Sequence, residues 1–402
     1  MSDAPNDALR IALVTETFPP EVNGVARTLN QLVRGLAARG HVLEVVRPRQ
    51  GKADVAMQLR PSPNGQPAWS ELLTAGCPIP MYPGLRFGLP TLRSLGRRWD
   101  EARPDVVHIA TEGPLGLVAL RAARYRGIPV ATTFHTNFHD YGDFYGYGGM
   151  HRLAVGYLRW FHNRTRRTLV PGPDVVERLA RRGFERLDVL SRGVDSQQFR
   201  PDRRNDELRA SWGAGPDDPV VVSVGRLAEE KNPELVIEGF RALRRIDQRW
   251  NCVVVGDGPA AESMRAAFPE GLFAGMRRGA DLAAHYASGD LLLFPSLTET
   301  FGNVLLEGMA CGLASVSFDY AAAAQLVSPG VDGYVAPRGD ADAWLGEVRA
   351  CAARPLDELR AVGRRAAARG AERTWERIVE RFEQVLRDVA AEGEVATRRG
   401  AT

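Results

Sequence analysis

The chain of 402 residues is too long for one ordinary hydrophobic core, so two domains are expected. Hydrophobic residues make up 44% of the chain and charged residues 25%, which are ordinary values for a globular protein. The formal net charge of +3 is small for this length and gives no case for a nucleic-acid partner.

The cysteines and the hydropathy indicate a cytoplasmic location. The four cysteines are scattered without a Cys-x-x-Cys pair, which is typical of buried thiols in a reducing compartment and not of disulfides or a zinc site. No apolar run approaches the roughly 20 residues needed to span a bilayer. The first strand is reached by Ile11 with no signal-peptide pattern before it. We therefore expect a cytoplasmic protein, or one attached peripherally to the inner face of the plasma membrane.

The start of the chain predicts a βαβ unit. Residues 10–15 form a short apolar run that is typical of a strand, and the loop at 16–24 contains Pro-Pro and Asn-Gly pairs. Residues 25–39 then repeat apolar side chains at helical spacing, and 41–46 form the next strand. The order indicates a right-handed crossover and a parallel sheet. Gly24 would let a phosphate approach the helix start, although a tight turn explains this glycine equally well.

The next segment, 51–90, is rich in proline and glycine and predicts irregular or short antiparallel structure. Strands are expected at 105–109 and 130–134, with a helix ending near Arg126 between them. His135 follows the second of these strands, at the edge where open α/β sheets bind ligands. His135 is therefore a candidate site residue, and a loop histidine satisfied by hydrogen bonds is the alternative.

A basic and aromatic helix is predicted at 153–167. It carries the following side chains: Tyr157, Arg159, Trp160, Phe161, Arg164, Arg166 and Arg167. Such a helix can rest on an anionic membrane surface. The alternative is a packed helix with a solvated basic side.

A polar segment with several prolines and glycines, 195–218, predicts a linker, after which the alternation of strands and helices restarts at 220–224. We expect two Rossmann-like domains with a cleft between them. The predicted divisions are an acceptor-side domain at 1–195, a donor-nucleotide domain at 196–372, a helix at 373–392 that packs back on the first domain, and a disordered tail at 393–402.

Two carboxylates stand eight residues apart after a predicted buried strand at 290–294. Glu299 falls in the turn, Glu307 lies about one turn inside the helix predicted at 303–310, and Gly302 between them permits close approach of a ligand. Thr298 or Thr300 is expected to cap this helix. Carboxylates accept hydrogen bonds from hydroxyls and free helix amides bind phosphate, so the pattern suits a nucleotide sugar. A capped helix with two solvated glutamates is the alternative.

A pair of cations follows the strand at 220–224. Arg226 and Lys231 lie five residues apart, with a bend between them, and can clamp a diphosphate and offset the charge that grows as it leaves. The alternative is surface pairing with Glu229 and Glu230. The combination with Glu299 makes a ligand site the stronger interpretation, since a diphosphate clamp and a polyol clamp would then border one site.

These motifs together resemble the family-4 retaining glycosyltransferases of the GT-B fold. The residues that carry the resemblance are Gly225-Arg226, Lys231-Asn232, Gly256-Asp257-Gly258-Pro259, and the pair Glu299 and Glu307, which has that family's E-x7-E spacing. The match covers nearly the whole chain. The segments 15–25 and 134–138 are similar to the bacterial branch that uses GDP-mannose as the donor for building glycolipids.

The resemblance implies a role for each candidate residue. Arg226 and Lys231 would bind the donor diphosphate, and Glu299 would hold hydroxyls of the transferred sugar. The remaining assignments are backbone amides around Phe301, Gly302 and Asn303 for the donor, Glu307 for the ribose, Gly24 near the diphosphate, and His135 beside the transferred sugar and the acceptor. The family retains the anomeric configuration. No cofactor and no metal ion are expected, since the donor is a nucleotide sugar and no DxD-type cluster is present.

The sequence departs from the family after the strand at 314–318. Many members carry a Gly-Gly pair and a glutamate there, whereas this chain has Asp319-Tyr320 followed by four alanines and Gln325. The expected function is transfer of mannose from GDP-mannose to a lipid-linked or glycolipid acceptor. The alternatives are a UDP-sugar donor of glucosyl or sulfoquinovosyl type and a nucleotide-sugar epimerase. A dinucleotide-dependent oxidoreductase is disfavoured, because neither domain's first loop has the G-x-G-x-x-G pattern.

Overall fold

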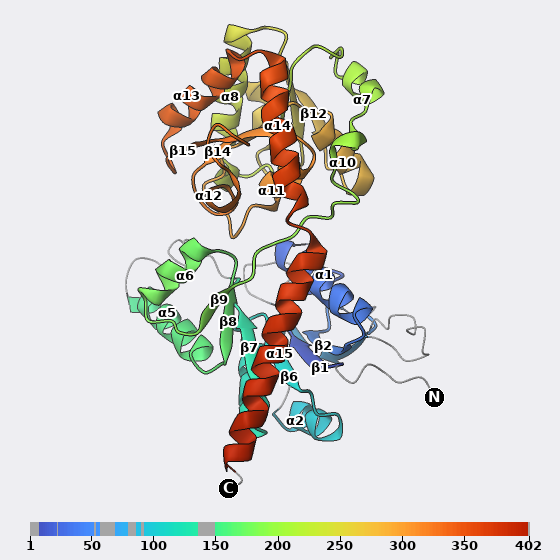
Figure 1. Ribbon diagram of the computed structural model, residues 1–402, viewed down its shortest axis with the longest axis vertical. Coiled ribbons are helices and arrows are strands. Elements are labelled where there is room, and N and C mark those ends of the chain that lie inside the picture. The colour runs from blue at the N-terminus through green and yellow to red at the C-terminus, as the bar shows by residue number, and fades with distance from the viewer. Residues whose placement is uncertain are drawn as a thin grey trace. The chain divides into compact units, whose positions relative to one another are not determined.

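The computed structural model describes residues 8–21, 23–51, 54–56, 69–78, 86–89, 92–135 and 149–400, with the backbone alone at 149–151 and 394–400. The chain divides into two compact units (Figure 1). The first unit contains the residues up to Ser191 together with those from Trp375 onward, and the second unit contains Arg192–Thr374. The division lies four residues before the predicted one at 195/196.

The first unit is built on a seven-stranded parallel sheet in the order β3-β2-β1-β6-β7-β8-β9. Its strands are β1 (Arg10–Val14), β2 (Val42–Pro48), β3 (Trp69–Thr74), β6 (Val106–Ile109), β7 (Val130–Thr133), β8 (Arg167–Val170) and β9 (Leu187–Val189). A two-stranded antiparallel pair, β4 (Gly76–Pro78) and β5 (Arg86–Gly88), stands apart from the sheet. The described helices are α1 (Gly24–Ala38), α2 (Leu92–Glu101), α3 (Pro114–Tyr125), α5 (Gly149–His162), α6 (Pro173–Ala180) and α15 (Trp375–Gly400).

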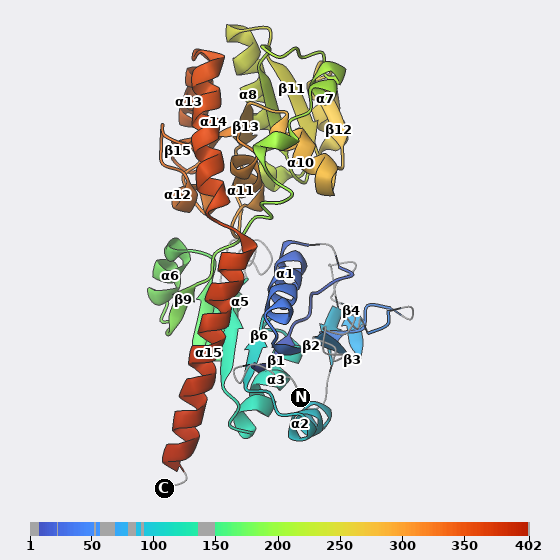
Figure 2. The same cartoon turned by 45° about the vertical axis from the view of Figure 1, so that its right-hand side comes forward.

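The C-terminal helix α15 belongs to the core of the first unit. Figure 2 shows α15 alongside α1, and the two helices are in contact. Its apolar stripe, which includes Phe382 and Leu386, is buried in one cluster with Leu32 and Leu36 of α1. Because this stripe repeats at helical spacing, the sequence forms one long amphipathic helix whose burial is tertiary.

Polar contacts also fasten α15, through the carboxylate of Glu383. Glu383 pairs with Arg39 and with His41, whose Nε2 lies 3.1 Å from Glu383 Oε1. Burial by itself would raise the pKa of this carboxyl. Hydrogen bonds from Arg387, Arg39 and His41 outweigh that effect and lower the pKa to about 2. The helix is therefore held to α1 and β2 by an ionised carboxylate as well as by apolar packing.

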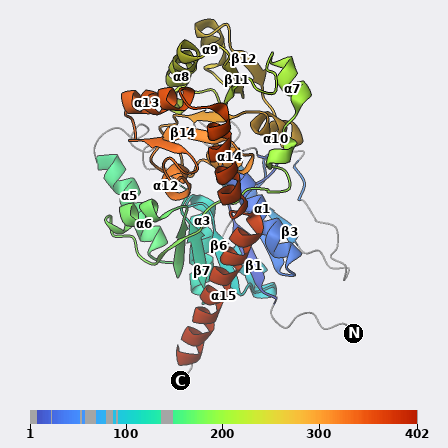
Figure 3. The same cartoon turned by 45° about the horizontal axis from the view of Figure 1, so that its top comes forward.

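The second unit has a six-stranded parallel sheet in the order β12-β11-β10-β13-β14-β15. Its strands are β10 (Val220–Val224), β11 (Asn251–Val255), β12 (Leu272–Gly275), β13 (Leu291–Phe294), β14 (Ala314–Phe318) and β15 (Tyr334–Ala336). The helices are α7 (Asp206–Ser211), α8 (Pro233–Ile246), α9 (Ala261–Ala267), α10 (Gly279–Ala287), α11 (Asn303–Ala310), α12 (Ala322–Leu326), α13 (Ala341–Ala352) and α14 (Leu356–Ala371), with 3-10 turns η1 (Pro201–Arg203) and η2 (Glu229–Lys231). Figure 3 shows α8 beside α13, with which it is in contact.

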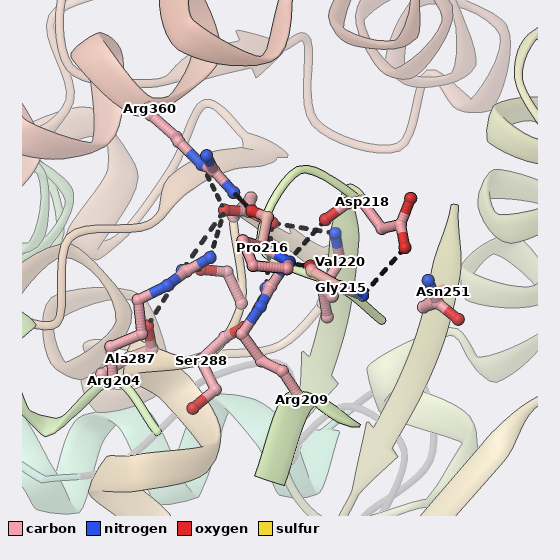
Figure 4. Close-up of polar contacts among 12 residues, drawn as sticks. Arg204, Arg209, Gly215, Pro216, Asp218, Val220, Asn251, Ala287, Ser288 and Arg360 are labelled. Carbon is pink, nitrogen blue, oxygen red and sulfur yellow. Dashed lines mark hydrogen bonds and ion pairs between the residues drawn. The ribbon is translucent and has the colours of Figure 1, made fainter. Parts of the chain in front are cut away.

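A buried carboxylate, Asp290, precedes β13 and organises its amino-terminal end. Figure 4 shows the side chains of Arg204, Arg209 and Arg360 pointing toward one another. Its side chain is fully buried and meets three guanidinium groups, those of Arg204, Arg209 and Arg360, at 2.9–3.3 Å. Asp290 Oδ2 also accepts a hydrogen bond from the backbone N–H of Val220 at 2.9 Å. One side chain thus joins the segment before β10, helix α7 and helix α14 to the central strand.

Three local expectations are wrong in whole or in part. The segment 51–90 contains the expected short antiparallel pair, β4 and β5, but strand β3 in the same segment adds a parallel edge to the sheet, where Trp69 is buried against Phe18. Helix α5 ends at His162, so Arg167 starts β8 and the predicted helix 153–167 is too long. Helix α15 continues to Gly400, where a disordered tail was predicted to begin at 393.

Candidate functional site

The cationic loop of the second unit begins where β10 ends. Gly225 has a φ of 144°, which favours glycine, and η2 begins four residues later. Asn232 takes the left-handed conformation that turns the chain into Pro233, the first residue of α8. The Arg226 side chain is 65% exposed and pairs with Glu230 four residues on. The predicted pairing on the surface therefore exists for Arg226, while its guanidinium remains open to solvent.

The Gly256-Asp257-Gly258 motif supports this loop through its backbone. A Cβ atom at Gly256 would lie 1.8 Å from the carbonyl oxygen of Gly225, and one at Gly258 would lie 2.4 Å from that of Leu227. Leu227 N–H donates to the carbonyl of Asp257 at 2.9 Å. The glycines of this motif are therefore required because two loops pack against each other without room for side chains.

Lys231 connects the cationic loop to the carboxylate loop. Its ammonium donates to a carboxylate oxygen of Glu299 and lies 3.3 Å from the hydroxyl oxygen of Ser296. Both side chains are partly buried, with 28% of Lys231 and 14% of Glu299 exposed. Lys231 and Ser296 also line one cavity at the carboxyl ends of β10 and β13. The structure thus brings together Lys231 and Glu299, which are 68 residues apart in sequence.

Helix α11 begins without a side-chain cap. Its N-cap residue is Gly302, with a φ of 105°, and no side chain bonds to the first turn. The expected capping by Thr298 or Thr300 is therefore wrong. The side chain of Phe301 is buried in the core, and that of Asn303 is partly buried. Because the amides of the first helical turn have no intrahelical partner, this helix start can accept an anion.

Glu307 lies on the second turn of α11 and is 7% exposed. The hydroxyl of Tyr286, a fully buried residue of α10, donates to Glu307 Oε2 at 3.2 Å. This hydrogen bond orients the carboxylate. Sequence reasoning missed Tyr286, because its distance from Glu307 along the chain carries no pattern.

The segment 319–325, where the sequence departs from the family pattern, has a backbone conformation that is typical of glycine. Ala321 has a φ of 53° and a ψ of −123°, a region that residues with a Cβ rarely adopt. The next residue, Ala322, donates its N–H to the carbonyl of Phe301 at 2.7 Å. The strained turn therefore abuts the start of α11, although this chain has alanine where many relatives were expected to have glycine.

Gly24, in the first unit, is the first residue of α1. The N-cap residue Asn23 accepts a hydrogen bond from Ala26 N–H at 2.8 Å. A Cβ at Gly24 would find no described atom within 4 Å. Within the described residues, neither crowding nor a positive φ requires a glycine at this position. Close approach of a ligand therefore stays a prediction beside the tight turn.

Gly24→Ala should separate these explanations. The variant should unfold at the same temperature or slightly higher, because alanine costs up to about 1 kcal/mol less than glycine in a helix. Its kcat/KM for the donor should fall by about tenfold or more, since the methyl group would occupy the approach to the backbone. Gly346→Ala in α13, also with open space at the Cβ position, is the matched control. Full activity of Gly24→Ala would contradict a role in ligand binding.

Two carboxylates stand at the carboxyl edge of the first sheet, between β1 and β6, where the strand order reverses. Glu16 follows β1 and accepts a hydrogen bond from Leu115 N–H of α3 at 3.1 Å. Glu112 follows β6, and its Oε1 lies 3.0 Å from Nε2 of the buried His162. His135 follows β7 on the same edge, and the rest of the predicted segment, 136–141, lies outside the described residues. Glu16, Glu112 and His162 were not predicted.

Burial of Glu16 should make the stability of the protein depend on pH. Burial first, and the nearby charge of Glu112, raise the pKa of Glu16 from 4.5 to about 7 against hydrogen bonds that lower it. A raised folded-state pKa means that the folded state binds the proton more tightly than the unfolded state does. Its contribution is therefore fully present below pH 4.5 and is lost as the pH rises through 7.

Glu16→Gln should remove this dependence. At about 1.4 kcal/mol per pKa unit, the wild type should lose roughly 3 kcal/mol relative to the variant between pH 4.5 and 8. Thermal unfolding of both proteins across this range measures the difference. Parallel curves would show that Glu16 does not hold a proton in the folded state.

Two parallel-sheet α/β units of this kind, with cations and carboxylates at the carboxyl edges of their sheets, define a GT-B glycosyltransferase. A search of solved structures bears out the fold. The sucrose-phosphate synthase from Thermosynechococcus elongatus aligns with a TM-score of 0.76 and 19% identity, covering 96% of this chain and all of that one. The predicted fold class is confirmed.

The family follows from the sequence comparisons. Residues 22–198 match the model described as Glycosyltransferase Family 4, and residues 218–354 match Glycosyl transferases group 1. The GDP-mannose-dependent alpha-mannosyltransferase of Mycolicibacterium smegmatis is 33% identical over 94% of this chain and 98% of its own length. The sulfoquinovosyl transferase SQD2 of Arabidopsis thaliana is 28% identical over 77% of this chain and 59% of its own. The chain belongs to glycosyltransferase family 4 and is a hexosyltransferase, as the resemblance predicted.

Proposed function

We propose that this enzyme transfers mannose from GDP-mannose, with retention of configuration, to a lipid-linked or glycolipid acceptor. The observation that carries the proposal is the contact of Lys231 with Glu299 close to the uncapped start of α11. A cation for a diphosphate and a carboxylate for sugar hydroxyls stand at one sheet edge. The similarity to a GDP-mannose-dependent alpha-mannosyltransferase over nearly the whole chain supports the choice of donor.

In the proposed reaction the protein positions the donor and stabilises charge. Lys231 and Arg226 bind the diphosphate and offset the negative charge that grows as the bond to the sugar breaks. Glu299 and the amides of Phe301, Gly302 and Asn303 hold the sugar, Glu307 holds the ribose, and Gly24 and His135 contribute from the first unit. The acceptor hydroxyl attacks the anomeric carbon from the face that the diphosphate leaves, and a leaving phosphate oxygen takes its proton.

Calorimetric titration with GDP, UDP and ADP tests the donor assignment without an acceptor. Preferential binding of GDP would support the mannosyl function. Preference for UDP would keep the donor site and overturn the proposed sugar, in favour of the alternative that similarity to a sulfoquinovosyl transferase suggests. No binding of any of the three would contradict the donor site itself. Product analysis without acceptor excludes an epimerase if no free epimerised nucleotide sugar forms.

We further propose that transfer needs no metal ion. The cations Arg226 and Lys231 supply the positive charge at the diphosphate that a divalent metal supplies in other sites. Addition of a chelator should therefore leave the rate of transfer unchanged. A loss of activity that added magnesium or manganese restores would overturn this part of the proposal.

We also propose that the enzyme is cytoplasmic and reaches its acceptor at an anionic membrane surface through α5. Among the described residues, no helix combines the length and hydropathy needed to cross a bilayer. The exposed face of α5 carries Arg152, Leu153 and Arg159, and Leu153 is 75% exposed. An exposed apolar side chain beside cations suits peripheral contact with anionic lipid. Leu153→Ser should weaken binding to vesicles that contain anionic lipid, and unchanged binding would favour the solvated-face alternative.

A further inference from the structure

The amino-terminal edge of the first sheet contains a cavity that the proposed reaction does not use. It has a volume of about 520 Å³ and is lined by the segments that lead into β7, β8 and β9. Arg124 of α3 and Gly393 of α15 complete its lining. Glu16, Glu112 and His135 lie at the opposite, carboxyl edge of this sheet. A parallel sheet keeps these two edges a strand length apart, so the cavity is separate from the candidate site.

The cavity is strongly cationic. Four of its lining residues are arginines, namely Arg124, Arg164, Arg166 and Arg186. Of these, Arg186 forms an ion pair with Glu185 at 2.9 Å. No ion pair joins the other three guanidinium groups to any described carboxylate. This corner therefore concentrates positive charge in a chain whose formal net charge is +3.

Backbone carbonyls accept hydrogen bonds from three of these guanidinium groups, those of Arg124, Arg164 and Arg186. Arg124 Nη1 donates to the carbonyl of Arg164 at 3.2 Å, and Arg186 Nε donates to that of Thr165 at 3.0 Å. The guanidinium carbon of Arg164 lies 4.3 Å from the centre of the Trp160 ring. A solvated basic surface needs no such fixing, whereas preorganised donors lower the entropy cost of binding an anion.

The backbone at Arg186 gives a second, independent observation. Its φ is 52°, in the left-handed region where bulky residues are rare and cost about 1 kcal/mol or more. Glycine or asparagine would adopt this turn at lower cost. The conformation directs Arg186 to the carbonyls of Thr165 and Asn163, at the wall of the cavity. An arginine kept in a strained conformation at a cationic cavity indicates a function for its side chain.

We propose that this cavity binds a phosphate-bearing anion, either a free polyphosphate or the phosphate headgroup of an anionic lipid. Guanidinium groups match phosphate oxygens with paired hydrogen bonds, and several can share one ligand. The volume lies within the range of small-molecule pockets. The site is independent of the donor chemistry, since it shares no residue with the candidate donor site.

Titration with inorganic pyrophosphate in the Lys231→Ala background tests a free ligand, because that change weakens the donor site's own hold on phosphate. The double variant Arg124→Ser/Arg166→Ser should weaken the remaining pyrophosphate binding by about tenfold or more. Each guanidinium forms charge-assisted hydrogen bonds with phosphate, which are stronger than hydrogen bonds between neutral groups. Arg34→Ser, at an exposed arginine of α1, is the matched control and should bind as the background does. Circular dichroism and thermal unfolding verify that the variants are folded.

Vesicles of phosphatidylcholine with and without phosphatidic acid test a lipid ligand. Binding that requires phosphatidic acid, is lost in the Arg124→Ser/Arg166→Ser pair and persists in Arg34→Ser would assign the site to a lipid phosphate. If the arginine pair changes neither pyrophosphate nor vesicle binding, the proposal is overturned. Vesicle binding that depends on Leu153 and not on the arginine pair would exclude the lipid headgroup as the ligand, while leaving the proposed role of α5 intact.

Discussion

Lys231→Ala is expected to lower kcat/KM for sugar transfer by at least about a hundredfold, since it removes a preorganised charge from the breaking bond. Lys231 lies 3.3 Å from Ser296 and also contacts Glu299, so its loss should affect both the proposed diphosphate subsite and the proposed sugar subsite. The side chain is partly exposed, and the variant should therefore fold normally. Initial rates with saturating and limiting donor would separate the effects on kcat and on KM.

Two further variants sharpen this test. Lysine occurs in the chain at Lys52 and Lys231, whereas arginine supplies nearly all other cations. Lys231→Arg keeps the charge but replaces a compact ammonium with a planar fork, so it should remain well below wild-type activity. Arg241→Ala, at an exposed cation of α8, is the control and should retain full activity. Undiminished transfer by folded Lys231→Ala would refute the assignment of the donor site.

Asp290→Asn is expected to give the largest loss of stability in the second unit. The fully buried carboxylate faces Arg204, Arg209 and Arg360, and the Arg209 side chain is itself 1% exposed (Figure 4). Removing one partner of a buried ion pair leaves charge uncompensated and costs about 3–5 kcal/mol. For a unit of this size the midpoint of thermal unfolding should fall by about 10 °C.

Glu358→Gln provides the matched change at an exposed carboxylate. Glu358 is 62% exposed and lies 3.8 Å from Arg354, so its charge should contribute less than about 1 kcal/mol. Calorimetry of both variants measures the difference. Equal unfolding temperatures for Asp290→Asn and Glu358→Gln would mean that the arginine cluster does not stabilise the unit. Arg360→Met, which removes a partner that is 24% exposed, should give an intermediate loss.

The donor side of the site was predictable because its residues lie within two short segments. The cations at 226 and 231 flank one turn, and the carboxylates at 299 and 307 flank the start of one helix. Each segment follows an apolar run that predicts a strand, and parallel strands place their carboxyl ends at one edge. Lysine is rare in this chain, and this rarity is a further sequence feature that singles out Lys231. The prediction from motif spacing did not take it into account.

Residues brought together by long-range packing were not predictable in this way. Tyr286 contacts Glu307 from a different helix, and Glu16 contacts the start of α3 across 99 residues. Strand β3 was hidden because its sequence lies among prolines and glycines, and its pairing with β2 decides its conformation. The cap of α11 was assigned to a threonine, whereas the left-handed backbone of Gly302 forms the turn.

The sequence by itself determined the alternation of strands and helices, the GT-B class, the family and the segments that carry the donor motifs. These depend on local periodicity and on residue spacing within single loops, which the order of residues encodes directly. The tertiary structure alone decided which side chains meet. The three arginines around Asp290 and the cationic cavity before β7, β8 and β9 each bring distant segments together. Their energies depend on burial and distance, and neither quantity is defined until the chain has folded.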